Sequence, residues 1–101
     1  MSRSGGCALS EYRICEAEEL EKSLRKLTAR DADFIRRKLT SQVYPQLRQA
    51  PYHGPQIKKL RGYRPETWRY RIGRYRVFYL VEEQSRTVSI LTVDHRKDAY
   101  S

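Results

Sequence analysis

Three arginines in the second half of the chain have the spacing needed to hold a phosphate. Arg69 and Arg71 alternate with apolar residues, and Arg76 follows shortly after. If Gly73-Arg74 is a two-residue turn, Arg71 lies directly opposite Arg76, and all three arginines share one face of a sheet. A guanidinium donates two hydrogen bonds to one phosphate and stabilises charge that develops on it. Since facing like charges are unfavourable in an isolated sheet, we expect an anion to bind there.

The end of the chain adds groups that can move protons. His95, Arg96 and Tyr100 follow directly on a predicted last strand. Histidine and tyrosine side chains transfer protons, and an arginine lowers the pKa of a nearby phenol by favouring the phenolate. Taken singly, His95 more often has a structural role and Tyr100 more often covers a core. Together with the arginine face, these groups would surround one phosphate.

The sequence lacks the patterns of a metal or cofactor site. Asp94 and Asp98 are isolated acids, whereas a two-metal nuclease needs a carboxylate cluster, and no glycine-rich phosphate loop occurs. Cys7 and Cys15 have no ligand spacing, and we interpret both as reduced thiols in a cytoplasm. We therefore expect no cofactor. A metal-free ribonuclease must use the 2′-OH of the RNA as nucleophile, which leaves a 2′,3′-cyclic phosphate and a 5′-OH.

Positive charge is concentrated in one segment of the chain. The 101 residues carry 21 Lys and Arg against 12 Asp and Glu, a formal net charge of +9. Ile57–Arg76 contains eight basic residues and only Glu66 as an acid, a net +7. A basic strand face is often only solvated surface, but this concentration favours a polyanionic partner. No apolar run approaches the ~20 residues that cross a bilayer, so we expect a cytoplasmic protein without membrane contact.

Apolar periodicity predicts one short strand, then two helices, and then three further strands. One helical stripe runs through Ala17, Leu20, Leu24 and Leu27, and a second through Ala32, Ile35, Leu39 and Val43. Thr28 and Asp31 have the spacing of a capping box at the start of the second helix, and Pro45 should kink or end it. Strands are predicted at Tyr12–Ile14, Trp68–Ile72, Tyr75–Glu82 and Val88–Val93.

This order predicts an α+β fold, β-α-α-β-β-β, in which a helical hairpin packs on one face of a mostly antiparallel four-stranded sheet. The small and polar residues 1–9 predict a disordered tail, and residues 10–101 a single domain. Trp68, Tyr70, Ile72, Tyr75, Val77 and Tyr79 should face the helices. Tyr75–Glu82 is apolar on both faces and should be a central strand.

Four stretches together resemble the RelE/ParE superfamily of toxins from bacterial and archaeal toxin–antitoxin pairs. Ile57–Gly62 (IKKLRG) resembles the family's IKKLKG, and Trp68–Gly73 (WRYRIG) resembles its yRlRvG strand. Tyr75–Tyr79 (YRVFY) resembles YRViY, and Val93–Tyr100 (VDHRKDAY) resembles VghRkdvY. The element order agrees with the family over about residues 11–101.

The resemblance implies a toxin that cleaves mRNA in the A site of the 70S ribosome and is neutralised by a small antitoxin. The catalytic positions of the family match Arg69, Arg71, Arg76, Arg96 and Tyr100. The RelE branch often has lysines where Arg69 and Arg71 stand. Because arginine stays protonated, we assign both to phosphate positioning, Tyr100 to the general base and His95 to proton transfer.

Six further basic residues are expected to hold RNA, mainly that of the ribosome: Lys58, Lys59, Arg61, Arg64, Arg74 and Lys97. Arg74 replaces an acidic residue that is common in the family's turn. The basic surface also predicts an acidic, partly disordered partner, a RelB-like or other antitoxin. Two alternatives remain at this point: a ParE-like inhibitor of DNA gyrase, and a non-catalytic RNA-binding module or degenerate toxin.

Overall fold

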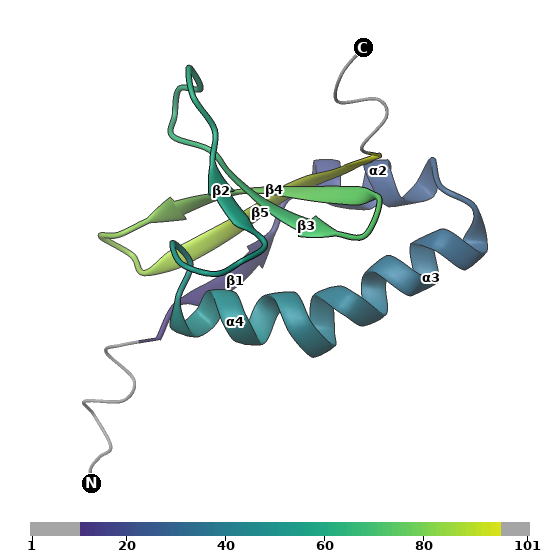
Figure 1. The fold of residues 1–101 in the computed structure, drawn as a ribbon, viewed down its shortest axis with the longest axis horizontal. Coiled ribbons are helices and arrows are strands. Elements are labelled where there is room, and N and C mark those ends of the chain that lie inside the picture. The colour runs from purple at the N-terminus through teal and green to yellow at the C-terminus, as the bar shows by residue number, and fades with distance from the viewer. Residues whose placement is uncertain (1–10, 96–101) are drawn as a thin grey trace, which may run out of the picture.

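A single mixed sheet with helices on one face forms the fold (Figure 1). In the computed structural model, which describes residues 11–95, the strand order is β1-β5-β4-β3-β2, with β1 parallel to β5 and the other pairs antiparallel. The strands are β1 (Arg13–Glu16), β2 (Ile57–Lys59), β3 (Trp68–Ile72), β4 (Tyr75–Glu82) and β5 (Thr87–His95). The predicted tail and three predicted site residues, Arg96, Lys97 and Tyr100, lie outside the described residues.

The two predicted helical stripes form the helices that cover the sheet. The first is α2 (Glu18–Arg25), and the second consists of α3 (Ala29–Lys38), a π-helical turn η1 (Leu39–Val43) and α4 (Tyr44–Gln49). The capping box is confirmed in part, because the Thr28 hydroxyl oxygen accepts the Asp31 N–H at 3.1 Å. Within residues 11–95, the helices all fall short of the length and apolar character that a membrane span requires.

Helical structure continues through Pro45 because the π-helical turn adapts to it. The Tyr44 N–H bonds to the carbonyl of Leu39, five residues earlier, and Pro45 then stands at the start of α4, where its missing N–H costs least. The sequence predicted a kink or an end at Pro45, and the structure shows a change of helix type.

Within residues 11–95 the sheet has five strands, so the predicted number of four was wrong. Ile57–Lys59 pairs antiparallel with β3, and Lys58 stands opposite Arg69. Three residues between glycine- and proline-containing loops are too few to show a period of two. The last strand also runs to His95 rather than ending at Val93.

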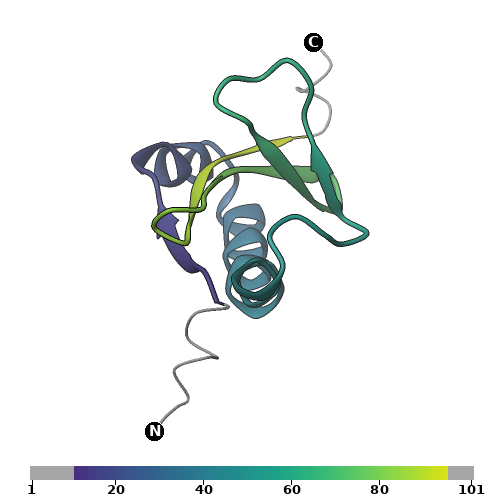
Figure 2. The same cartoon turned by 90° about the vertical axis from the view of Figure 1, so that its left-hand side faces the viewer.

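Alternate residues of β3 and β4 form the core beneath the sheet, as predicted. Tyr70, Ile72, Tyr75, Val77 and Tyr79 are buried against the helices, and Trp68 is half-buried at the margin. The buried tyrosines keep hydroxyl partners. Tyr79 donates to the Pro51 carbonyl at 2.6 Å, Tyr70 to Gln46 Oε1 at 2.8 Å and Tyr75 to Asp31 Oδ2 at 2.7 Å. The core therefore lies on one side, and the other face is not covered by helices (Figure 2).

The Gly73-Arg74 turn sets which side chains reach the uncovered face. Gly73 has φ 56°, which suits the first central position of a type II′ turn. Ile72 pairs with Tyr75 and Arg71 with Arg76, so the predicted register is confirmed. A shift of one residue would exchange the two faces and bury the arginines.

A cluster around Glu83 joins the far end of the sheet to the loop after α4. Its carboxylate accepts hydrogen bonds from the Tyr12 hydroxyl, at 2.8 Å, and from the Tyr52 hydroxyl. Arg86 lies over the Tyr12 ring and also contacts Glu83. The two phenol donors hold the pKa of Glu83 below its ordinary value of 4.5. Burial, reinforced by the carboxylate, raises the pKa of both phenols.

This cluster predicts a specific loss of stability in acid. A carboxylate with a lowered pKa stabilises the fold above its ordinary pKa, and the contribution disappears as pH falls through the lowered value. We expect Glu83→Gln to lower the free energy of unfolding near neutral pH and to flatten its decline as the pH falls below the ordinary carboxyl pKa of 4.5. Urea unfolding at a series of pH values measures both, and parallel curves for the two proteins would contradict the assignment.

Candidate nucleic-acid interface

Two rows of side chains cross the uncovered face of the sheet at right angles to the strands. The strand register gives the first row as Lys58, Arg69, Phe78 and Thr92, and the second as Arg71, Arg76 and Asp94. Neighbouring strands are ~4.8 Å apart and successive same-face residues ~6.6 Å, so four cationic side chains share a small area. The predicted grouping of Arg69, Arg71 and Arg76 on one face is therefore present in the structure.

The second row places opposite and like charges side by side. Arg76, on the central strand β4, stands between Arg71 on one side and Asp94 on the other. Arg71 and Asp94 are exposed, whereas Arg76 is half-buried. Asp94 offsets part of the repulsion between the two arginines. The net positive charge of the row, on a surface open to solvent, suits a phosphate that binds between two guanidinium groups.

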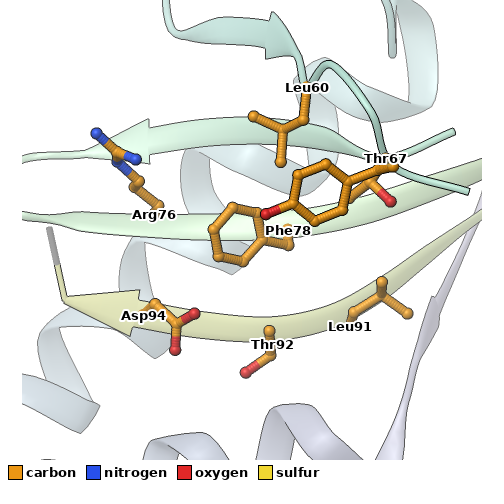
Figure 3. A pocket seen from close by; sticks show the side chains of 8 residues that line it. Leu60, Thr67, Arg76, Phe78, Leu91, Thr92 and Asp94 are labelled. Carbon is orange, nitrogen blue, oxygen red and sulfur yellow. The ribbon is translucent and has the colours of Figure 1, made fainter. Parts of the chain in front are cut away.

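Beside the arginines, the same face is hollowed by a pocket of about 460 Å³ (Figure 3). Its lining is aromatic and aliphatic at one end and charged at the other: Leu60, Tyr63, Thr67, Arg76, Phe78, Leu91, Thr92 and Asp94. In Figure 3, Leu60 and Phe78 lie close together, while Asp94 and Arg76 lie toward one end of the strands. The pocket therefore combines an apolar floor with a polar rim, as ligand sites do.

A bulge in the sheet brings Leu91 into this pocket. Phe78 pairs with Thr92 but Tyr79 pairs with Ile90, so Leu91 is an extra residue on β5. Such a bulge re-aims a side chain that regular alternation would send to the opposite face. Leu91 consequently lines the pocket together with Phe78 and Thr92.

The loop between β2 and β3 forms the wall of the pocket. Its base is closed by a hydrogen bond from the Leu60 N–H to the Thr67 carbonyl at 2.9 Å, and Lys59 and Glu66 form an ion pair of 2.8 Å. In both views the loop rises from the sheet on the side opposite α3 and α4 (Figures 1 and 2). Tyr63, within the loop, has 56% of its surface exposed.

The other predicted RNA-binding residues are distributed unevenly around this face. Lys58 lies on the same face as the strand arginines. Lys59 pairs with Trp68, so its side chain lies on the opposite face of the sheet. Arg61 and Arg64 are exposed in the loop, and Arg74 is exposed in the β3–β4 turn. The structure thus gathers Lys58 with the arginines and leaves the others at the margin.

His95 does not join the arginines. It pairs with Tyr75, on the helical side of the sheet, and its ring meets the Tyr75 ring edge-on with centroids 5.1 Å apart. Tyr75 itself is poorly suited to act as a base, because burial, its hydrogen bond to Asp31 and the charge of that carboxylate raise its pKa. The described residues therefore assemble the cationic part of the predicted site.

Sequence reasoning missed the pocket. The sequence pattern presents Asp94 only as an isolated acid, and it gives Phe78, Tyr63 and Leu91 no role in a site. An aromatic residue within a basic loop is a visible signal for Tyr63. The role of Leu91 depends on the bulge. The sequence of β5 does not reveal this bulge, because apolar residues occur at both odd and even positions of the strand.

Comparison with known proteins identifies the family. Residues 17–100 match the family model described as the ParE toxin of type II toxin–antitoxin systems, parDE. The chain belongs to this family and is thus a toxin of the RelE/ParE superfamily. A search of curated proteins gave no significant match.

Solved structures of RelE toxins have the same fold. In the RelBE2 toxin–antitoxin complex from Mycobacterium tuberculosis, the matched chain is 26% identical, with a TM-score of 0.65 over 85% of this chain and 99% of that one. The archaeal RelE–RelB complex from Pyrococcus horikoshii matches at 25% identity and a TM-score of 0.58, over 85% and 96% of the two chains. A mutant of the E. coli toxin RelE in the free state, 22% identical, shares the fold at a TM-score of 0.61 over 89% and 88%.

The row of Arg71, Arg76 and Asp94 is called the arginine row below. Loss of one of its arginines should have opposite effects on stability and on RNA binding. Replacing Arg71 with Thr removes a facing like charge, so the free energy of unfolding should stay the same or rise by about 0.5 kcal/mol. Binding to single-stranded RNA should weaken, and the negative slope of log affinity against log salt should decrease in magnitude by about 0.7. Denaturant unfolding and salt-dependent fluorescence anisotropy measure the two quantities.

Arg30→Ala is the matched control for this prediction. Arg30 is an exposed arginine in the first turn of α3, on the helical side of the molecule. Its loss removes the same charge but should leave the salt slope nearly unchanged. An Arg71 variant that is less stable yet binds RNA like the wild type would contradict a phosphate-binding role for the row.

Proposed function

We propose that this toxin is a ribosome-dependent, metal-independent endoribonuclease that cleaves mRNA codons in the ribosomal A site and so arrests translation. The observation that carries the proposal is the convergence of Arg69, Arg71 and Arg76 on the uncovered face of the sheet. The likeness to chains of RelE–RelB complexes at 25–26% identity supports the same branch of the superfamily.

The arginine face suits transesterification by the RNA itself. In the proposed step, the 2′-oxygen attacks the adjacent phosphorus and the bond from phosphorus to the 5′-oxygen breaks. The leaving 5′-oxygen takes up a proton from solvent, so the products are a 2′,3′-cyclic phosphate and a 5′-OH. Arg69, Arg71 and Arg76 would hold the phosphate and stabilise the negative charge that grows on its oxygens. Permanently charged guanidinium groups serve this purpose but cannot remove the 2′-OH proton.

Proton transfer is assigned to the end of the chain. We propose Tyr100 as the base that takes the 2′-OH proton and Arg96 as a further group at the phosphate. Both follow β5, whose Asp94 already stands in the arginine row. His95 pairs with Tyr75 on the other face, so we propose it as a secondary proton carrier at most.

Mapping of mRNA ends in a translation extract tests the proposal. Wild-type toxin should produce cuts within A-site codons, read by primer extension. Arg76→Ala, Arg96→Ala and Tyr100→Phe should each reduce the cleavage rate, by about 100-fold or more for a group that acts in the transition state. Arg30→Ala should cleave like the wild type. Undiminished cleavage by the Arg96 and Tyr100 variants would overturn their assignment.

One observation favours a second candidate function, inhibition of DNA gyrase. The family model that matches residues 17–100 is that of ParE toxins, and inhibition of gyrase is the activity that resemblance to the ParE branch implies. A supercoiling assay separates the two functions. Inhibited supercoiling with normal translation would favour gyrase, whereas RNA binding without cleavage or gyrase inhibition would indicate a non-catalytic module.

We also propose an acidic antitoxin as partner. Two similar structures are toxin–antitoxin complexes, RelBE2 from Mycobacterium tuberculosis and RelE–RelB from Pyrococcus horikoshii. The basic face of this chain has the charge to attract an acidic partner of the same kind. Co-expression with an acidic protein encoded beside this gene should relieve growth arrest, and the pair should co-purify. Growth arrest that persists despite a folded, expressed neighbour would exclude that neighbour as the antitoxin.

A further inference from the structure

The pocket beside the arginine row has chemistry that phosphate binding does not use. We propose that it binds one nucleobase of single-stranded RNA, stacked on Tyr63 and read by Asp94, and that it prefers bases with an exocyclic amino group over uracil. The inference rests on the proposed function in one respect, namely that RNA is the ligand of the arginine row.

Tyr63 provides the stacking surface. Its side chain is large and mostly exposed, and it belongs to a loop whose base is closed by the Leu60–Thr67 hydrogen bond. Together with Leu60 and Phe78 it gives the pocket aromatic and aliphatic walls. Exposed aromatic rings beside a basic groove are the usual platform for unpaired bases, because every base has a π face.

Asp94 provides the selective contact. Its carboxylate lines the pocket, and a phosphate would be repelled from it. An ionised carboxylate only accepts hydrogen bonds, so it favours a donor such as the amino group of cytosine N4 or adenine N6. Uracil presents a carbonyl oxygen where cytosine has its amino group. Its one donor on this edge, N3–H, lies between the O2 and O4 carbonyl oxygens, which repel a carboxylate, so uracil should face Asp94 less favourably than cytosine.

The dimensions and the surroundings of the pocket fit this occupant. A volume of about 460 Å³ lies within the usual range for ligand pockets, roughly 300–1,000 Å³. Arg76 lines the pocket and also stands in the arginine row, so a phosphate on the row and a base in the pocket can belong to neighbouring parts of one strand.

The experiment compares short oligo(C) and oligo(U) RNAs, whose bases differ in the group at position 4 and in the proton on N3, by fluorescence anisotropy with the full chain. Wild type should bind oligo(C) about tenfold more tightly than oligo(U). Asp94→Asn should abolish most of this preference, since an amide both donates and accepts. Tyr63→Ala should weaken binding of both RNAs about tenfold without changing the salt slope, and Tyr63→Phe should bind like the wild type.

Phe34→Ala is the matched control, since Phe34 is an exposed aromatic residue on α3, 43% exposed, away from the pocket. It should change neither affinity nor preference. Equal binding of oligo(C) and oligo(U) by wild type would overturn the inference. So would a preference that survives Asp94→Asn, unweakened binding by Tyr63→Ala, or no measurable binding of either RNA.

These readouts are independent of catalysis. If the chain does not cleave mRNA but shows the C-over-U preference and its loss in Asp94→Asn, the proposed function fails and the pocket assignment stands. If it cleaves mRNA while binding both RNAs equally, the proposed function stands and the pocket assignment fails.

Discussion

The short connection between β3 and β4 is the constraint on which the rest of the molecule depends. With Gly73 at φ 56°, only two residues separate the strands, and the pairing of Arg71 with Arg76 follows directly. The same register sends Tyr70, Ile72, Tyr75 and Val77 into the core. Because strand side chains alternate, core and charged face are two consequences of one turn. A change in the register of β3 and β4 would therefore displace both the core residues and the charged residues.

The charged face is held in an arrangement that the isolated sheet does not favour. Facing arginines repel each other, and Asp94 offsets only part of that repulsion in the second row. The cost is small compared with the burial of the aromatic core on the opposite side of the same strands. A phosphate bound between the two guanidinium groups would offset their repulsion and accept hydrogen bonds from both. For this reason we interpret the row as a binding site rather than as ordinary surface.

Local patterns were sufficient to predict most of the elements and the grouping of the strand arginines. Alternation in Trp68–Ile72 and the turn at Gly73 fixed Arg69, Arg71 and Arg76 on one face, and the threonine cap fixed the start of α3. Each of these features depends on neighbours within a few residues.

What could not be predicted depends on contacts between distant segments. The three-residue strand β2 exists only by pairing with β3, and the bulge that turns Leu91 into the pocket exists only in the β4–β5 pairing. The side of the sheet that His95 takes follows from the extension of β5 beyond Val93. The pocket itself is assembled from β4, β5 and the loop before β3, and no single segment carries its signature.

Observation of the arginine side chains during RNA binding tests the central claim most directly. In a protein with ¹⁵N-labelled arginine, the Nε–Hε signals report which guanidinium groups contact a ligand. Titration with single-stranded RNA should shift the signals of Arg69, Arg71 and Arg76 and leave those of Arg30 and Arg37 on α3 in place. Shifts confined to the α3 arginines, with the strand signals unmoved, would contradict the assignment of the uncovered sheet face as the RNA interface.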